Sequence, residues 1–381
     1  MKNVLFIHQS SELYGSDKTL LLLLKSIDKQ KFFCTVVLPT QGPLKEELDL
    51  IGIKVIISPV LKLHRNIFRL KHAILFFKDF FSSLSSLKKL HNEDKFDLVY
   101  SNTLAVLSGA FFAKQNKIKH IWHVHEIIEH PKLIAWIYPK LLNYFSNVII
   151  CNSEATKKNI VSREKNNSQK TVVIYNGIDN YGCEEQSNIY NSDFLYLEND
   201  IVITLVGRIN KIKGHNWLLK TFNEYFKQFK NVKILIVGSP VKSQEFYLHN
   251  LEKYIVSNNL TETVKIIPFT TNLKAIWNIT DIAVMPSTEK ESFGLVALEA
   301  MLAKKPVVAS NHGGLTEIVV DSKTGFLVEP NNIVDLKEAL EKLINNPELR
   351  SDFGENGFKR AVENFSVQNY VSKIEDILQN N

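Results

Sequence analysis

Short apolar, β-branched runs alternate with longer amphipathic stretches along almost the whole chain, and this alternation constrains the fold more than any other feature. The pattern is typical of strand–helix units, in which helices cover the strands of a parallel sheet. In the first half it predicts strands at Val4–His8, Thr35–Leu38, Val55–Ile57, Leu98–Ser101, His120–His123, Val148–Cys151 and Val172–Ile174. A second series is predicted at Ile201–Val206, Ile234–Val237, Val264–Ile267, Ile282–Met285, Val307–Ala309 and Phe326–Val328. The sequence therefore predicts an α/β protein.

A polar, irregular stretch divides the two strand series, and the chain of 381 residues is long enough for two domains. We predict a Rossmann-like domain over residues 1–180, a linker over 181–200 and a second Rossmann-like domain over 201–364. A final helix over 365–381 could pack on either domain, including the N-terminal one. Two doubly wound sheets would face a central cleft, because open α/β sheets bind ligands at the carboxyl ends of their strands.

Cysteine content and hydropathy bear on the location of the protein. The three cysteines, Cys34, Cys151 and Cys183, are too few and too scattered for a disulfide framework or a thiolate metal site. No apolar run approaches the roughly 18 residues of a membrane span, and Met1–His8 lacks the apolar core of a signal peptide. These features predict a cytoplasmic protein, with any membrane contact confined to its surface.

Two motifs of the first half follow predicted strands. The turn Gln9–Asp17 leads into a helix at Lys18–Ile27, for which Ser16 or Asp17 is the predicted N-cap. Gly15 in this turn would let backbone amides approach an anionic ligand, although a simple turn glycine is an equal alternative.

The second motif, WHVHE, places His123 and His125 on the same side of a strand end. A pair of histidines without a third ligand is poor support for a metal site. A functional role and a structural role stay open for both, and we prefer His125 for function.

In the second half, VGRINKIKG follows the first strand. Arg208 and Lys213 would converge on one polyanion from this short loop, with a planar fork and a compact charge that suit diphosphate oxygens. Solvated surface charges are the alternative interpretation.

The segment Pro286–Ser310 is the most informative. It places Glu291 in a loop after a strand and Glu299 eight residues later, inside a helix that begins near Gly294. Backbone amides at a helix N-terminus form an anion site, and a buried glutamate needs hydrogen-bonding partners. The alternative is a pair of exposed surface glutamates. The glycines of the following HGG sequence, Gly313 and Gly314, are explained equally well by tight turns.

In these motifs the chain resembles the family 4 retaining glycosyltransferases of the GT-B fold, also called glycosyl transferases group 1. The resemblance covers most of the chain and rests on Gly15, the pair His125-Glu126, YNGID at 175–179, VGRINKIKG at 206–214, ESFGLVALE at 291–299 and HGGLTEIV at 312–319. The E-x7-E and GR-x4-KG elements are specific when they occur together in this order.

The resemblance implies residue roles. Arg208 and Lys213 would hold the nucleotide diphosphate, Glu299 would accept hydrogen bonds from ribose, and His125 would lie near the reacting sugar. The first-domain loop with Gly15 would lie under the phosphates. The implied catalytic set is His125, Glu291, Arg208 and Lys213, and the donor-binding set adds Gly15, Phe293, Gly294, Leu295, Val296 and Glu299. The chain departs from the family pattern at YGSD, where a glycine pair is common, and at Glu126, where Asp is frequent; we keep His123 in reserve.

The implied chemistry is transfer of a hexosyl-type sugar from a nucleotide sugar to a hydroxyl, with retention at the anomeric carbon. A same-face dissociative route is expected, and double displacement stays open. No D-x-D motif occurs in the chain, so we expect no metal and no other cofactor. UDP is the expected nucleotide, with GDP as the alternative.

The acceptor would bind the first half, where residues 1–190 carry 25 basic and 17 acidic side chains. The segment Leu61–Leu90 contributes most of this charge, interleaved with phenylalanines, and the candidates for the acceptor or membrane side are Arg65, Arg69, Lys71 and Lys78. Such a segment is typical of a helix that binds an anionic membrane surface, although its apolar residues could equally form the core-facing side of an ordinary helix. A lipid-linked glycan acceptor in capsule or lipopolysaccharide biosynthesis would follow. Nucleic acid is not expected, because no binding module accompanies the charge.

Two other functions compete with the transferase. A sugar-nucleotide 2-epimerase of similar fold would bind the same donor, and a non-catalytic protein would bind a nucleotide sugar without turnover. E-x7-E with GR-x4-KG favours the transferase, and retention of the whole residue set argues against the non-catalytic alternative. A dehydrogenase is least favoured, because the dinucleotide fingerprint is absent.

Overall fold

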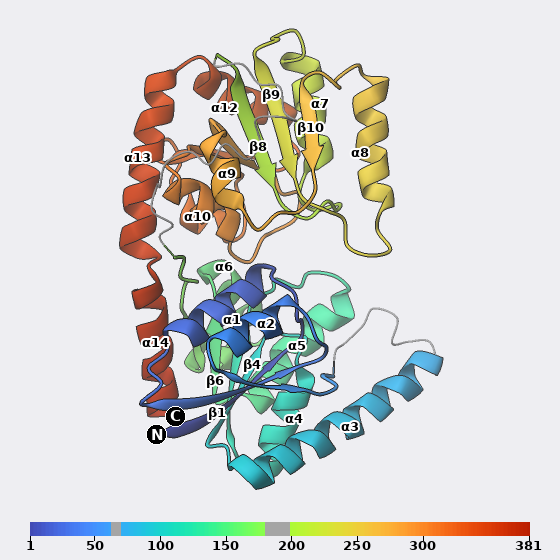
Figure 1. The fold of residues 1–381 in the computed structure, drawn as a ribbon, viewed down its shortest axis with the longest axis vertical. Helices are drawn as coiled ribbons and strands as arrows, with labels where there is room; N and C mark the ends of the chain where they lie inside the picture. Colours follow the sequence, from blue (N-terminus) through green and yellow to red (C-terminus); the bar gives the residue numbers. More distant parts are fainter. Residues whose placement is uncertain (62–69, 180–198) are drawn as a thin grey trace. The chain divides into compact units, whose positions relative to one another are not determined.

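The computed structural model describes residues 1–61, 70–179 and 199–381. The chain divides into two compact units, one formed by Met1–Asp179 with Phe365–Asn381 and the other by the remaining residues up to Asn364. Each unit is an α/β body around one parallel sheet (Figure 1). The predicted pair of doubly wound parallel sheets is confirmed.

The first unit contains a seven-stranded parallel sheet of order β3-β2-β1-β4-β5-β6-β7. Each strand predicted in the first half overlaps an observed one: β1 (Lys2–His8), β2 (Phe32–Leu38), β3 (Lys54–Ile57), β4 (Leu98–Asn102), β5 (Lys119–Val124), β6 (Val148–Cys151) and β7 (Thr171–Val173). The connecting helices are α1 (Gly15–Ser26), α2 (Pro43–Leu50), α3 (Leu70–Asp94), α4 (Leu107–Asn116), α5 (Lys132–Phe145) and α6 (Glu154–Val161), with the 3-10 turn η1 (Lys165–Gln169).

The second unit contains a six-stranded parallel sheet of order β10-β9-β8-β11-β12-β13. Its strands are β8 (Ile201–Val206), β9 (Val232–Val237), β10 (Val264–Ile267), β11 (Ile282–Met285), β12 (Val307–Ser310) and β13 (Gly325–Val328). Its helices are α7 (His215–Tyr225), α8 (Phe246–Ser257), α9 (Leu273–Asn278), α10 (Leu295–Leu302), α11 (Leu315–Ile318), α12 (Ile333–Ile344) and α13 (Pro347–Asn364).

The strand order reverses once in each sheet, between β1 and β4 in the first unit and between β8 and β11 in the second. Chain connections leave toward opposite sides at such a point, so the carboxyl ends of the two strands are not covered by a shared crossover. These two points are therefore the places where each unit can bind a ligand. Polar motifs follow β1, β4, β8 and β11 directly.

The last helix, α14 (Val367–Asn380), belongs to the first unit and lies beside α1 (Figure 1). Its buried residues Tyr370, Ile374 and Leu378 share one hydrophobic cluster with Leu20 and Leu24 of α1. The amphipathic pattern of α14 therefore closes one face of the N-terminal sheet with residues from the far end of the chain.

The basic, phenylalanine-rich segment is described in part. Arg65 and Arg69 lie outside the described residues, as does the side chain of Lys71 on α3, whereas Lys78 is exposed. Leu87 and Leu90, near the end of α3, are buried in the core, so this part of the helix has an ordinary core face. In the part of the chain that the structure describes, no helix is both long and apolar enough to cross a membrane.

Candidate active site

In the second unit, the loop after β8 is held against the end of β11. Gly214 is the N-cap of α7 and has a backbone φ of 73°, and a Cβ at this position would lie 1.7 Å from the Pro286 carbonyl oxygen. Both the left-handed conformation and the close approach require glycine. The last glycine of VGRINKIKG thus holds Lys213, its neighbour, beside the loop that carries Glu291.

Lys213 and Glu291 form an ion pair in this loop cluster. The Lys213 Nζ lies 2.8 Å from Glu291 Oε1, and the two side chains are 25% and 15% exposed. The Ser287 hydroxyl donates to the same carboxylate oxygen. Burial raises the pKa of Glu291, but the charge and hydrogen bond of Lys213, the Ser287 hydroxyl and the His312 ring outweigh it, so that the pKa lies below its ordinary value. Glu291 is therefore ionised and hydrogen-bonded at neutral pH.

The HGG sequence packs against the backbone of the loop that carries Glu291. The Gly314 N–H donates to the Glu291 carbonyl oxygen at 2.7 Å. A Cβ on Gly313 would lie 2.4 Å from that carbonyl oxygen, and one on Gly314 would lie 2.5 Å from the Ser292 carbonyl oxygen. Any larger residue at either position would push the Glu291 loop out of place.

A small pocket collects the candidate donor residues of the second unit. Its lining includes Lys213, Ser287, Glu291, Gly294 and Val296. Helix α10 begins here, and its free N-terminal amides together with Lys213 favour an anion. The other predicted donor residues lie around it: Phe293 and Glu299 are buried, Leu295 is half-buried, and Arg208 is exposed in the loop after β8.

In the first unit, His125 follows β5 and lies close to the end of β4. Its Nε2 is 2.9 Å from Asn102 Oδ1. Burial, followed by the nearby His123 and His8, holds the pKa of His125 well below its ordinary value, so the ring is neutral at neutral pH.

His123 is more enclosed than His125. It is fully buried, its Nδ1 lies 2.7 Å from the Tyr100 hydroxyl, and burial lowers its pKa to about 3. This environment suits a structural histidine, and only His125 has part of its surface exposed.

The predicted N-cap of the first helix is wrong. Helix α1 begins at Gly15 with Tyr14 as its N-cap, three residues ahead of the predicted start. The Asp17 carboxylate turns back to accept the Tyr14 N–H at 2.8 Å and also lies 2.5 Å from His8 Nε2. Asp17 therefore occupies the third helical position, where a carboxylate satisfies a free amide of the first turn.

Sequence reasoning missed four polar residues of these sites: His8, Asp17 in its present role, Asn102 and Ser287. His8 and Asn102 are the last residues of their strands, and Ser287 comes two residues after β11. A polar residue at the carboxyl end of a predicted central strand was the available signal. Among residues 1–61, 70–179 and 199–381, no group of three or more His, Cys, Asp or Glu side chains is placed to hold a metal ion.

Glu126 gives the first unit a pH-dependent stability. Its Oε2 accepts the N–H groups of Leu104 and His125 at 3.0 and 3.1 Å. Burial raises the pKa of Glu126 to about 7, although these two hydrogen bonds lower it. The folded state therefore holds this proton more tightly than the unfolded chain does. The stabilisation is complete below about pH 4.5 and is lost as the pH rises through about 7.

We expect Glu126→Gln to remove this dependence, because the glutamine carbonyl can accept both N–H groups without ionising. Between pH 4.5 and 8, wild-type stability should fall by roughly 2 kcal/mol relative to the variant, a value reduced for solvent screening at the partly exposed carboxyl. Urea unfolding of both proteins across this range measures the difference, in which the buried histidines cancel. A difference that stays constant with pH would contradict the assignment.

Two family models match the chain. Residues 15–180 match the model described as Glycosyltransferase Family 4, and residues 190–360 match Glycosyl transferases group 1. A curated relative, the capsular polysaccharide biosynthesis glycosyltransferase CapM of Staphylococcus aureus, is 30% identical over 320 residues, which cover 81% of this chain and 83% of CapM.

Solved structures resemble the fold along its whole length. The structure of Anabaena HepE in complex with UDP and glucose has a TM-score of 0.84 at 23% identity and covers 99% of each chain. A structure of a Staphylococcus aureus TarM variant, in complex with ligands that include UDP, has a TM-score of 0.76 at 14% identity and covers 99% of each chain. At these identities the two likenesses concern the fold alone.

Proposed function

This chain belongs to the family 4 glycosyltransferases, and from that premise we propose that it transfers a sugar from a UDP-sugar to a hydroxyl of a lipid-linked glycan, with retention at the anomeric carbon and without a metal ion. The observation that carries the donor part is the pair of Lys213 and Glu291 beside the N-terminus of α10. A fixed cation and free amides suit the diphosphate, and a carboxylate suits sugar hydroxyls. The UDP complexes of HepE and TarM and the capsular role in the name of CapM support the same donor and pathway class.

In the proposed reaction, the bond between the anomeric carbon and the diphosphate oxygen breaks, and the acceptor oxygen bonds to that carbon on the same face. The acceptor proton passes to the leaving diphosphate. Negative charge therefore grows on the diphosphate in the transition state, where Lys213, Arg208 and the amides of α10 would stabilise it. Glu291 would hold the donor sugar, and His125 would have its role at the reacting sugar.

The donor assignment predicts metal-independent binding of UDP. In titration calorimetry and thermal-shift measurements, UDP and one UDP-sugar should bind and stabilise the protein equally with EDTA and with Mg²⁺, while CDP should not. Stabilisation by GDP instead of UDP would show that the donor nucleotide contains guanine rather than uracil. Absence of any nucleotide effect would overturn the donor site.

An acceptor-free assay separates the competing functions. Conversion of UDP-GlcNAc to its 2-epimer without an acceptor would establish the epimerase. Nucleotide binding with neither hydrolysis nor transfer of any donor would establish a non-catalytic binding protein.

The proposed membrane contact is supported by an exposed face of α5. Leu133, Trp136 and Tyr144 lie on one side of this helix and are 52%, 57% and 63% exposed. The Lys140 Nζ lies 3.4 Å from the Trp136 ring centroid, and Lys114 of α4 covers Tyr144. Amphipathic rings beside lysines are suited to the headgroup region of an anionic membrane.

Partly buried rings connect α5 with α3 beneath this face. Tyr144 stacks edge-on against Phe145, and Phe145 contacts Phe111 of α4. Phe111 in turn contacts Phe80 of α3, whose neighbour Phe81 is exposed. The described part of α3 is therefore connected with α5, and we propose that both helices contact the cytoplasmic leaflet next to a lipid-linked acceptor.

We expect the double substitution Trp136→Ala and Tyr144→Ala to reduce co-sedimentation with vesicles rich in phosphatidylglycerol by at least tenfold, because both interfacial rings are lost. Phe229→Ala in the second unit, where the ring is 47% exposed, is the matched control and should leave binding unchanged. Equal binding by the double variant and the wild type would refute this surface.

A further inference from the structure

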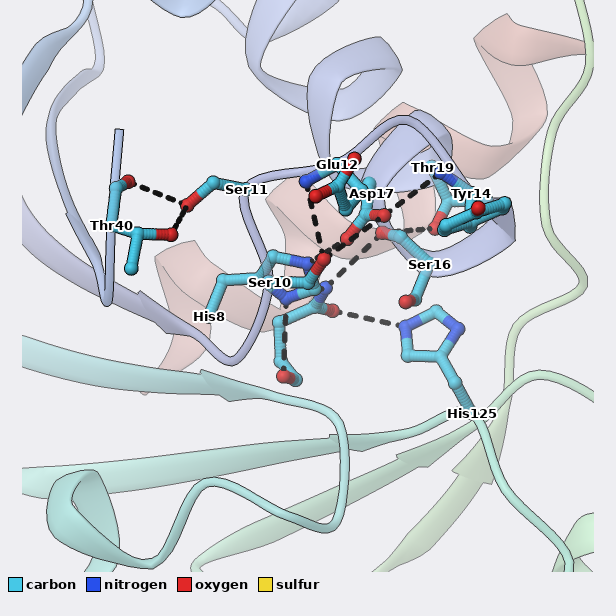
Figure 2. A network of polar contacts seen from close by, with 11 residues as sticks. His8, Ser10, Ser11, Glu12, Tyr14, Ser16, Asp17, Thr19, Thr40 and His125 are labelled. Atoms are coloured by element: carbon cyan, nitrogen blue, oxygen red, sulfur yellow. Dashed lines mark hydrogen bonds and ion pairs between the residues drawn. The ribbon is translucent and has the colours of Figure 1, made fainter. Parts of the chain in front are cut away.

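Four polar side chains of the first unit form a continuous hydrogen-bonded chain that ends at His125. Asp17 Oδ1 lies 2.5 Å from His8 Nε2, and His8 Nδ1 lies 3.0 Å from Asn102 Nδ2. Asn102 Oδ1 then lies 2.9 Å from His125 Nε2. Figure 2 shows Asp17 on one side of His8 and His125 reaching toward the same cluster from β5.

The sheet itself brings these residues together. His8 pairs with Asn102 in the register of β1 and β4, and Asn102 pairs with His123 in the register of β4 and β5. His8, Asn102 and Asp17 are each at most 1% exposed, whereas His125 reaches the surface. Three buried side chains are thus hydrogen-bonded in series to one ring that a ligand can reach.

Backbone groups beside Asp17 and Asn102 orient the two side chains whose hydrogen-bonding groups decide the direction of these bonds. Asp17 Oδ2 accepts the Tyr14 N–H, a donor whose polarity cannot change. Asn102 Nδ2 also faces the Ser16 carbonyl oxygen at 3.4 Å, so the amide nitrogen points toward Ser16 and His8. With this orientation, Asn102 Oδ1 faces His125 and can only accept.

The histidine tautomers follow. His8 Nδ1 lies 3.0 Å from the Asn102 amide nitrogen and 3.4 Å from the Asn102 main-chain carbonyl oxygen. The closer contact, with the amide nitrogen, makes Nδ1 an acceptor, so the His8 proton is on Nε2 and is donated to Asp17. His125 must donate from Nε2 to Asn102 Oδ1, so the neutral ring carries no proton on Nδ1. The lone pair of Nδ1 is then the acceptor that His125 can offer to a ligand.

We propose that Asp17, His8 and Asn102 are positioning residues that fix the ring orientation and the Nε2–H tautomer of His125, so that Nδ1 accepts a hydrogen bond from a hydroxyl of the reacting sugar. The tautomer itself is independent of the proposed function, and only its use toward the sugar rests on that function. A residue that hydrogen-bonds to one ring nitrogen of a working histidine selects its tautomer without touching the substrate.

Asp17→Asn is the sharpest test because it reverses the direction of the hydrogen bond between residue 17 and His8. The asparagine oxygen must stay on the Tyr14 N–H, which leaves the NH₂ group facing His8 Nε2. His8 then carries its proton on Nδ1, where the Asn102 carbonyl oxygen can accept it, and its bond to the Asn102 amide nitrogen is lost. Only the 3.4 Å contact with the Ser16 carbonyl oxygen then orients the Asn102 side chain, so the acceptor of His125 is less firmly held. Asn102→Leu, which removes that acceptor directly, is the second variant.

Nitrogen-15 NMR of histidine-labelled protein reads the tautomer directly, with His125→Gln used to assign the His125 signals. We expect the wild type to show an unprotonated Nδ1 on His125 and both variants to shift it toward an Nδ1–H or mixed state. Asn167→Leu is the matched control: Asn167 is also buried in the first unit, but its amide donates to the Pro139 carbonyl, away from His125. A protonated Nδ1 in the wild type, or an unchanged His125 in both variants, would overturn the proposal.

Donor hydrolysis or transfer gives the kinetic test. Both variants should lower kcat by roughly 10- to 100-fold with KM for the donor changed less than about threefold, as expected for a misplaced reacting group. Asn167→Leu should affect melting temperature but not kcat. Equal losses in all three variants would mean a structural role. A wild type without any turnover would instead refute the proposed function and leave the NMR result standing.

Discussion

Lys213→Ala should lower the affinity for UDP and the value of kcat/KM together, by roughly 30- to 1000-fold. Lys213 is paired with the largely buried Glu291 at 2.8 Å, so its removal leaves an uncompensated carboxylate beside the pocket where the diphosphate would bind. Loss of one partner of such a pair costs about 2 to 4 kcal/mol, and each 1.4 kcal/mol is about a factor of ten. Calorimetric titration with UDP and initial-rate kinetics measure the two quantities.

Two variants separate the phosphate role of Lys213 from its structural role. Lys211→Ala removes an exposed lysine of the same loop and should leave UDP binding nearly unchanged. Lys213→Ala with Glu291→Gln should recover thermal stability, because no unpaired charge remains, but should not recover UDP affinity. Unchanged donor kinetics in Lys213→Ala would remove Lys213 from the diphosphate site.

His125→Ala should lower kcat by about 10²- to 10⁴-fold while the affinity for UDP changes less than about threefold. The neutral ring is held by Asn102 in the first unit, and the donor pocket is built from residues of the second. A group that acts only on the reacting sugar contributes to the transition state more than to nucleotide binding.

His130→Ala is the control for His125→Ala, because His130 is exposed and lies five residues further along the chain. Its kinetics should match the wild type. If His125→Ala lost UDP affinity and kcat in equal measure, His125 would have a structural role rather than a catalytic one.

The sequence predicted the secondary structure of both sheets well, because parallel strands buried on both faces must be continuous runs of apolar residues. Ile201–Val206 and Val148–Cys151 were predicted with their observed bounds, whereas β1 begins before its apolar run, at Lys2, and β2 begins at Phe32, three residues before the predicted start at Thr35. Hydrogen bonding to a neighbouring strand, rather than hydrophobicity, decides where such an end lies.

The motifs could be found from the sequence because glycines and charged residues occur together in the loops that follow predicted strands. Gly214, Lys213 and Glu291 all lie in loops that follow predicted strands, and the structure places Lys213 and Glu291 around one pocket. The predicted start of α1 was wrong. Asp17 is a residue type that favours the N-cap, but here its carboxylate accepts hydrogen bonds from Tyr14 and His8 inside the first turn. Capping preferences are local, and the buried histidine that draws Asp17 inward comes from another element.

By itself, the sequence determined the α/β class, the two strand series and the residues that follow each central strand, because burial on both faces and tight turns impose local patterns. Only the tertiary structure decided that Lys213 pairs with Glu291, that α14 returns to the first unit, and that Asp17, His8 and Asn102 lead to His125. These contacts join residues that are far apart in the chain, or depend on the register of β1, β4 and β5. Register is selected by the packing of the whole sheet, and no short stretch of sequence contains that information.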